Sequence, residues 1–191
     1  MKKQKCAICA NSDYRILYPA NYSLSKLNSK IFSARRLPDQ IHYRIVKCNK
    51  CGLIYSNPIL DPKTIKKLYQ ASSYTYGNYE PDLIATYWDY LKKYAHPNSS
   101  STLLEIGCGN GFFLNYLASK GIKNVRGIEP GAEVAKMAPK KIQKRIIINI
   151  FKPGQFKQNT FDIICCFQIL DHIIDPNKFI NECYKILKPV G

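Results

Sequence analysis

The sequence lacks several features that would place the protein outside the globular, water-soluble class. It has no run of about 18 apolar residues, which a membrane-spanning helix would need. Its first residues are basic but are not followed by the apolar stretch of about 7–15 residues that a secretory signal carries. It contains no internal repeats. We therefore expect a soluble cytoplasmic protein with no membrane partner.

Acidic residues are scarce. The chain has 13 Asp and Glu against 29 Lys and Arg, which gives a formal net charge of +16. An excess of this size occurs in nucleic-acid-binding proteins. The lysines are dispersed along the chain, however, and no arginine cluster or mixed basic and aromatic stripe stands out. We favour general surface charge, and binding to nucleic acid stays open as the alternative.

The length of 191 residues allows one sizeable core and a small accessory module. We divide the chain into three parts: 1–60 with two C-x-x-C pairs, a helical linker region at 61–100, and 101–191. In the linker region, Asp61 and Pro62 have the residue types of a helix N-cap and first helical position. Further along, the apolar stripe from Leu83 to Tyr94 has helical spacing and predicts core packing.

From residue 101 onward, short apolar runs alternate with helical patterns. Continuous apolar runs are typical of parallel strands covered on both faces, so the class is α/β with a doubly wound, mostly parallel sheet. One helix is expected from GAEVAKMAPKK, and a last helix starts after Asp175 with Phe179 and Ile180 facing inward. The expected strands are TLLEIG, IKNVRGIE, RIIINI and FDIICCF.

A glycine-rich segment follows the first of these strands. Gly107, Gly109 and Gly111 give the pattern E-x-G-x-G-x-G, whereas a dinucleotide fingerprint would need a glycine where Phe112 stands. Glu105, two residues ahead of the first glycine, would repel a pyrophosphate and attract an ammonium or sulfonium group. S-adenosylmethionine fits that description.

The second strand supports the same cofactor. It ends in GIEP, which puts Glu129 at its carboxyl end, next to the glycine turn across the sheet. A carboxylate there can accept two hydrogen bonds from a ribose diol. Glu129 lies 18 residues after Gly111, close to the separation of about 20 that one βαβ unit imposes.

LLEIGCGNGFFL, GIEP, FDIICCFQILDHIIDP and ILKPVG resemble the successive motifs of the class I S-adenosylmethionine-dependent methyltransferases, over about residues 100–191. The resemblance implies a Rossmann-like sheet with the four strands in the order 3-2-1-4. It also implies the cofactor-binding residues Glu105, Gly107, Gly109, Gly111, Glu129 and Gln168.

The run after the fourth strand departs from the family pattern. The family often has H-x-L-E-H, and this chain has Gln168 at the first position, Asp171 for the Glu, and His172. By this resemblance Gln168 hydrogen-bonds the cofactor. His172 has two interpretations: a catalytic general base that exchanges a proton near neutral pH, or a structural residue that bonds the loop leading to Asp175.

The four N-terminal cysteines form two C-x-x-C pairs separated by 38 residues. Each pair can present two thiolates, and two pairs close a tetrahedral site that suits zinc. Four protein ligands leave no open position, so we expect structural zinc in a zinc-ribbon-like module. The metal ligands are Cys6, Cys9, Cys48 and Cys51.

CNKCGLIYSNP, a tyrosine-rich region and a methyltransferase-like segment together resemble bacterial zinc-containing methyltransferases, including sugar-nucleotide C-methyltransferases. In that subgroup a tyrosine between the two modules reaches the active site. Tyr69, Tyr74, Tyr76 and Tyr79 are candidates, and Tyr76 is preferred as catalytic. The alternative is that these tyrosines only pack the linker region.

The resemblance further implies a fifth strand, a helix and a hairpin after LKPGG, where this chain has LKPVG and stops. We expect either a fragment of a longer protein or a truncated chain that binds the cofactor weakly. The leading function is methyl transfer from S-adenosylmethionine to a small molecule, with a nucleotide-linked sugar as one acceptor class. The alternatives are an RNA methyltransferase, or an inactive fragment that retains zinc and partial cofactor binding.

Overall fold

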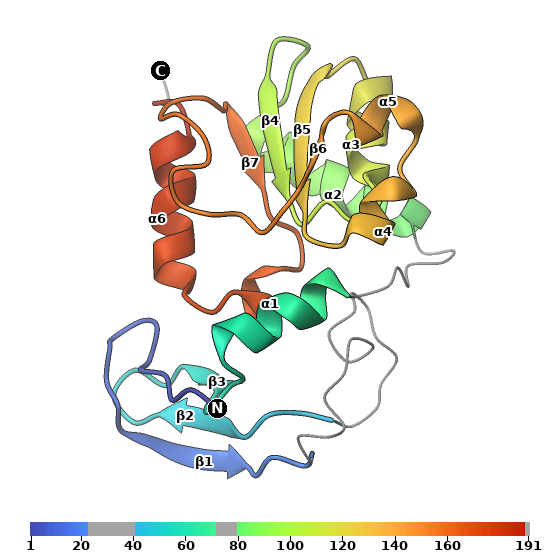
Figure 1. Cartoon of the computed structure of the whole chain (residues 1–191). Coiled ribbons are helices and arrows are strands. Elements are labelled where there is room, and N and C mark those ends of the chain that lie inside the picture. The colour runs from blue at the N-terminus through green and yellow to red at the C-terminus, as the bar shows by residue number, and fades with distance from the viewer. Residues whose placement is uncertain (23–40, 72–79, 190–191) are drawn as a thin grey trace. The chain divides into compact units, whose positions relative to one another are not determined.

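A computed structural model describes residues 1–22, 41–71 and 80–189 (Figure 1). The chain divides into two compact units, Met1–Ser72 and Ser73–Gly191. The division into three parts drawn from the sequence stays a prediction. Among the described residues, every helix is too short or too polar to cross a membrane.

The first unit contains a three-stranded antiparallel sheet in the order β1-β2-β3. Val46, in the central strand, is fully buried. A helix follows the sheet, and the Asp61 carboxylate accepts hydrogen bonds from the amides of Lys63 and Thr64 at 3.0 Å each, as the predicted N-cap should. The elements are β1 Tyr14–Tyr18, β2 Ile45–Cys48, β3 Ile54–Ser56 and α1 Pro62–Gln70.

The second unit is built on a four-stranded parallel sheet in the order β6-β5-β4-β7. When the strands are numbered along the chain from residue 101, this is the order 3-2-1-4 that the resemblance implied. The predicted Rossmann-like fold class is therefore confirmed. The strands are β4 Thr102–Ile106, β5 Asn124–Glu129, β6 Ile146–Ile148 and β7 Ile163–Cys165.

Helices cover both faces of this sheet (Figure 1). Leu83 of α2 and Phe113 of α3 share one core cluster with Leu103 of the sheet, whereas Phe179 of α6 joins Leu104 in a second cluster. The alternation of Leu103 and Leu104 between two cores is what a doubly covered strand requires. The helices are α2 Glu80–Ala95, α3 Phe112–Ser119, α4 Ala132–Lys136, α5 Lys140–Gln143, the 3₁₀ turn η3 Leu170–His172 and α6 Pro176–Ile186.

Three expectations for the helices were wrong. The single helix expected from GAEVAKMAPKK is two helices, α4 and α5, because Pro139 restricts the preceding residue and has no amide to continue the first one. Tyr94 and Ile180 are 67% and 51% exposed, although helical spacing had placed them inward. Tyr94 stacks on Tyr90 instead. The periodicity of a helix shows which residues share a face, but not how far along that face another element packs.

Candidate functional site

The turn between β4 and α3 depends on its glycines. Gly107, Gly109 and Gly111 have φ angles of 79°, 55° and 69°, in the left-handed region that side chains with a Cβ rarely adopt. A Cβ on Gly107 would also lie 2.5 Å from Cγ2 of Ile169. The turn therefore needs glycine at this position for both its backbone conformation and its close contact with the segment after β7.

Glu129 ends β5 directly beside this turn. Its side chain is buried, and its carboxylate accepts hydrogen bonds from the amide of Gly109 at 3.0 Å and from the amide of Gly131 at 2.8 Å. Burial raises the pKa of the Glu129 carboxyl, and these two hydrogen bonds act in the opposite direction. The carboxylate thus joins the glycine turn to the start of the next loop, and its contact with a ribose stays a prediction.

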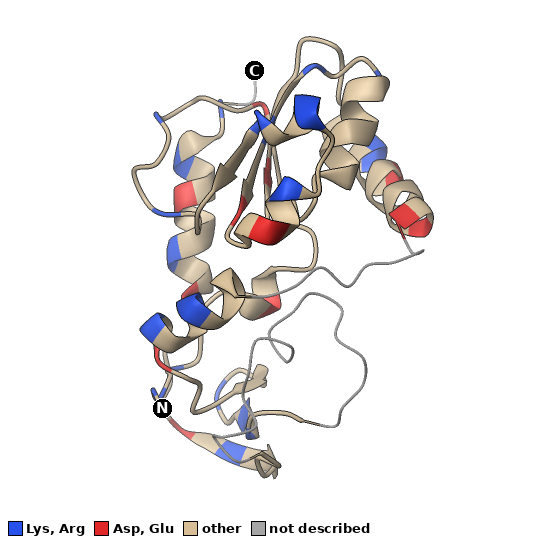
Figure 2. Ribbon diagram, turned by 45° about the vertical axis from the view of Figure 1, so that its right-hand side comes forward, with Lys and Arg blue, Asp and Glu red and all other residues tan. Residues whose placement is uncertain are grey.

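Glu105 lies within β4 and is 3% exposed. Its Oε2 atom is buried and has no hydrogen-bond partner among the described residues. Burial, and then the nearby carboxylate of Glu129, raise the pKa of the Glu105 carboxyl well above its usual value. Figure 2 colours all Asp and Glu red, and red segments are visible on the central strands.

This pair of buried carboxylates makes the site suited to a cation. A buried charge without a partner is unfavourable, and a positively charged ligand beside Glu105 would offset that cost. A pyrophosphate would instead add negative charge to the same place. The orphaned oxygen of Glu105 therefore fits a cofactor that carries an ammonium or sulfonium group.

Cys108, inside the turn, is a packing residue. Its side chain is buried, and burial together with Glu105 and Glu129 raises the pKa of the thiol well above its usual value, so the unreactive protonated form dominates. Its Sγ would lie 2.4 Å from a Cβ on Gly127 of β5. Cys108 thus fills the space that Gly127 leaves open.

The segment after β7 packs against the glycine turn through Ile169. Gln168, the residue before it, is exposed and has a φ of 54°. His172 is also exposed, in η3, with its Nε2 3.5 Å from Oδ2 of Asp171. The functional roles of Gln168 and His172 stay predictions, and Tyr76 lies outside the described residues.

Two contacts of α2 with distant segments had no signal in the sequence. Asn110 donates a hydrogen bond from Nδ2 to Oε1 of Glu80 at 2.8 Å, which ties the turn to the start of α2. Tyr87 of α2 stacks on Phe167 with ring centroids 3.9 Å apart and planes 4° from parallel. Both contacts hold α2 against segments that lie 30 or more residues away, so local patterns could not reveal them.

The first unit brings the four predicted metal ligands together. The Sγ atoms of Cys6, Cys9, Cys48 and Cys51 all lie within 4.8 Å of one another. Sγ of Cys6 is 3.3 Å from that of Cys51, and Sγ of Cys9 is 3.5 Å from that of Cys48. A zinc ion with four bonds of about 2.3 Å in a tetrahedron would separate its sulfurs by about 3.8 Å. The four thiols therefore have the spacing that such an ion needs.

The two C-x-x-C turns have the same backbone arrangement. The amide of Ala10 donates to the carbonyl of Cys6 at 2.9 Å, and the amide of Gly52 donates to the carbonyl of Cys48 at 3.0 Å. Ala10 and Gly52 both have positive φ, 57° and 80°. Amide hydrogen bonds, first that of Cys51, lower the pKa of the Cys48 thiol to about 6. Each turn thus holds its two sulfurs in the same way, and the pair forms one pseudo-symmetric ligand set.

A parallel α/β sheet with an acidic, glycine-rich turn after its first strand defines a nucleotide-cofactor-binding domain. Residues 104–191 match the family model described as a methyltransferase domain. This part of the chain is therefore similar in sequence to S-adenosylmethionine-dependent methyltransferase domains.

The curated relatives include bacterial enzymes named ubiquinone biosynthesis O-methyltransferase. The one from Actinobacillus pleuropneumoniae serotype 7 (strain AP76) is 30% identical over 113 residues, which cover 54% of this chain and 48% of the relative. The one from Histophilus somni (strain 2336) is 28% identical over 147 residues, which cover 69% of this chain and 61% of the relative. The chain thus spans about half the length of the curated relatives it matches.

Among solved structures, Haemonchus contortus phosphoethanolamine N-methyltransferase 2 in complex with S-adenosyl-L-methionine aligns with a TM-score of 0.54. It is 20% identical, and the alignment covers 72% of this chain and 36% of that one. At this identity the likeness establishes the fold alone.

Proposed function

We propose that this chain binds S-adenosylmethionine at the glycine turn and takes part in methyl transfer to a small molecule. The observation that carries the proposal is the unpartnered, buried Oε2 of Glu105 beside the Glu129 carboxylate. Two buried acids at the end of adjacent parallel strands suit a cationic adenosine derivative. The match of residues 104–191 to the methyltransferase domain model supports this class of reaction.

The residues of the turn would each have a distinct role. Gly107, Gly109 and Gly111 would let the backbone approach the methionine part, and the Glu129 carboxylate would accept from the ribose hydroxyls with its remaining lone pairs. Gln168 would hydrogen-bond the cofactor from the segment after β7. The bound cofactor supplies a methyl group on a positively charged sulfur, from which it can pass to a nucleophile in line.

For the acceptor, we propose a hydroxyl group on a small molecule. Support comes from the relatives, which are named as O-methyltransferases. A hydroxyl must lose its proton during transfer, so a base is needed there, and we assign that role to His172. Orientation of the acceptor would supply much of the rate. A nucleotide-linked sugar is a second candidate acceptor, because the cysteine cluster resembles that of sugar-nucleotide C-methyltransferases; there the methyl group would go to carbon, with Tyr76 as a candidate catalytic residue.

We also propose that Cys6, Cys9, Cys48 and Cys51 bind one structural zinc ion. The proposal is supported by the spacing of the four sulfurs and by the matching backbone bonds of the two C-x-x-C turns. Binding of a metal here can contribute on the order of 10 kcal/mol of folding free energy to a small unit.

Two measurements test these proposals separately. Release of S-adenosylhomocysteine from S-adenosylmethionine, assayed with a panel of phenols, catechols and nucleotide-linked sugars, tests the reaction. We expect acceptor-dependent release that falls at least tenfold in Glu129→Ala. Cofactor binding without release for any acceptor would contradict the transferase proposal for this chain.

The zinc proposal is tested by metal analysis of the purified chain. We expect about one zinc per chain, lost in Cys48→Ser and kept in Cys166→Ser, which removes an exposed cysteine of the second unit. Equal zinc content in both variants would contradict the assignment.

A further inference from the structure

A hollow of about 430 Å³ lies in the second unit at the amino ends of the parallel strands. Thr102 and Asn124 begin β4 and β5, and Arg145 directly precedes β6. The glycine turn and Glu129 lie at the carboxyl ends of the same strands, so the hollow is separate from the cofactor site. Its lining consists of Thr102, Lys123, Asn124, Val125, Arg126, Lys144, Arg145 and Ile147.

The charge of this hollow is positive. Lys123, Arg126, Lys144 and Arg145 line it, and no acidic residue is among its lining residues. Arg126 and Arg145 are also the only arginines in 73–191, although the dispersed sequence positions gave no sign of a cluster. Figure 2 shows in blue how widely Lys and Arg are otherwise scattered.

In the ranges that the structure describes, the four cations of the hollow have no acidic partner, in contrast to several other basic residues of the unit. Lys92, Lys136, Lys185 and Lys188 each form an ion pair with Asp or Glu. Within the part of the chain that the structure describes, no ion pair is formed by the four cations of the hollow. Their charges are therefore available to an external anion.

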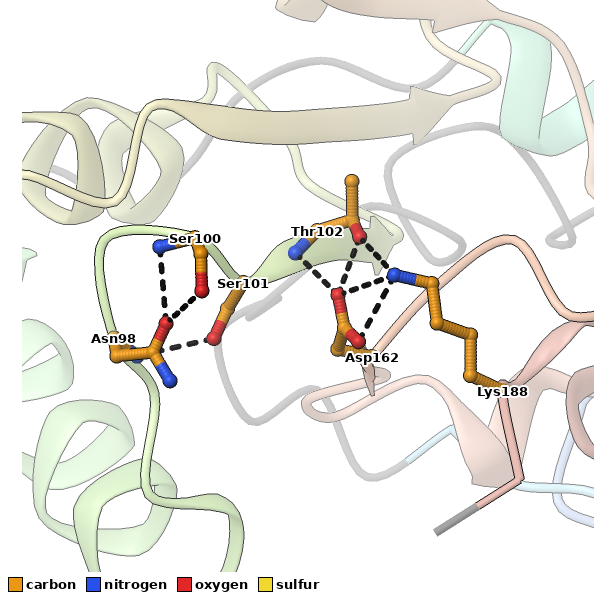
Figure 3. Close-up of polar contacts among 6 residues, drawn as sticks. All are labelled: Asn98, Ser100, Ser101, Thr102, Asp162 and Lys188. Atoms are coloured by element: carbon orange, nitrogen blue, oxygen red, sulfur yellow. Dashed lines mark hydrogen bonds and ion pairs between the residues drawn. The ribbon is translucent and has the colours of Figure 1, made fainter. Parts of the chain in front are cut away.

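The carboxylate at the edge of the hollow is already engaged (Figure 3). Asp162 accepts hydrogen bonds from the amide and the hydroxyl of Thr102, and Nζ of Lys188 lies 2.9 Å from its Oδ2. These bonds, first that of the Thr102 hydroxyl, lower the pKa of Asp162 to about 2. Its charge is matched by Lys188, so it does not neutralise the hollow.

Arg145 is held in place by the backbone. Its side chain donates from Nη1 to the carbonyl of Lys123, and its own carbonyl accepts from the amide of Gly127 at 2.9 Å. A guanidinium has five N–H donors, so this bond leaves others for a ligand. Arginine donors in a fixed geometry match the oxygens of phosphate well.

We propose that this basic hollow binds phosphate groups of a nucleotide or of RNA. The volume admits a group of the size of a pyrophosphate, and four unpaired cations around it would stabilise two or more negative charges. The proposal does not depend on methyl transfer, because none of its residues belongs to the glycine turn.

The test is calorimetric titration of the full chain at constant ionic strength, with sodium pyrophosphate and separately with a single-stranded RNA oligonucleotide. The variant is Arg126→Gln with Lys144→Gln, which removes two cations but keeps Arg145 and its backbone bond. The matched control is Lys140→Gln with Lys141→Gln, two exposed lysines on neighbouring α5 that do not line the hollow.

We expect at least one probe to bind, with about a tenfold or greater loss of affinity in the hollow variant and less than a twofold change in the control. Binding of pyrophosphate alone identifies a small phosphorylated ligand, and binding of RNA alone identifies the polynucleotide backbone. Equal losses in the two variants would show that net charge alone attracts anions and would overturn the proposal. Absence of binding by both probes would overturn it as well.

Discussion

Glu129 accepts the amide proton of Gly109 at 3.0 Å, although 20 residues separate the two along the chain. The contact exists because β5 pairs in parallel with β4, so the ends of both strands meet at one edge of the sheet. One buried carboxylate thereby fixes the shape of the turn that the cofactor would use. The same side chain is therefore a structural residue of the turn as well as the proposed ribose-binding residue.

Replacement of Glu129 by Ala should weaken both the folded structure around the glycine turn and the binding of the cofactor. Two buried amides, those of Gly109 and Gly131, would lose their acceptor, and each unsatisfied donor costs about 1–3 kcal/mol. We expect lower unfolding free energy in urea titrations and loss of S-adenosylmethionine binding. Glu133→Gln is the control, because that exposed acid forms only a surface pair with Lys136 and should change stability by less than about 1 kcal/mol.

Replacement of Glu105 by Gln should change how stability depends on pH. The pKa of Glu105 is raised in the folded state. The stability that its protonated form contributes is therefore fully present below about pH 4.5, the usual pKa of a Glu carboxyl, and is lost as pH rises through the folded-state pKa. Gln stays neutral, so the variant should gain stability relative to wild type between about pH 5 and 8, on the order of 1 kcal/mol or more.

The same Glu105→Gln variant should bind S-adenosylmethionine more weakly, since a neutral amide cannot match the positive charge of the ligand. Parallel urea and calorimetric titrations across this pH range check both effects. A parallel pH profile for variant and wild type would contradict the assignment of a raised pKa.

Replacement of Gly107 by Ala should distort the glycine turn. The new Cβ would lie 2.5 Å from the Ile169 side chain at a φ of 79°, so both the contact and the backbone conformation are unfavourable. We expect a loss of about 1–3 kcal/mol in thermal or urea unfolding. Gly154→Ala is a useful comparison, because it has a φ of 75° but nothing within 4 Å of its Cβ position. An equal loss in both variants would mean that the Ile169 contact contributes nothing.

Replacement of Ala10 by Gly should stabilise the first C-x-x-C turn. Ala10 has a φ of 57°, a conformation that glycine adopts without the steric cost of a Cβ, and Gly52 already occupies the matching place in the other turn. We expect a gain of up to about 1 kcal/mol in the zinc-bound protein. A loss of stability or of zinc affinity would contradict the pseudo-symmetric arrangement.

Replacement of Asp162 by Asn should weaken the contact between the start of β4 and Lys188, just after α6. The lowered pKa of Asp162 means that its contribution is present above about 3.8 and is lost as pH falls through about 2. We expect a loss of about 1 kcal/mol at neutral pH, because the group is partly exposed, and a smaller loss at pH 2. Urea unfolding at the two pH values measures the difference.

Much of the second unit could be predicted because its signals are local. The apolar runs gave its strands, the pair Asp175–Pro176 gave the start of its last helix, and the family resemblance gave the strand order. In the first unit, the pair Asp61–Pro62 gave the start of α1 in the same way. The position of Glu129 beside the glycine turn followed from its place at the end of the second strand together with the βαβ spacing. Likewise, the clustering of the four cysteines followed from their two C-x-x-C pairs.

Other features depend on where distant segments meet, which no local pattern records. Ile169 reaches Gly107 from another loop, and Glu80 reaches Asn110 from another helix. The basic hollow brings together Arg126 of β5 and Arg145, which directly precedes β6, although the two are 19 residues apart in the sequence. The exposure of Tyr94 similarly could not be read from its helical spacing.

The central claim is that the carboxylate-flanked turn selects a positively charged adenosine cofactor. Calorimetric titration of the full chain with S-adenosylmethionine, and separately with NAD, tests it most directly. The account predicts saturable binding of S-adenosylmethionine with one site per chain, at least tenfold weaker in Glu129→Ala, and no binding of NAD. Binding of NAD, or no saturation by millimolar S-adenosylmethionine in a chain that unfolds cooperatively, would contradict it.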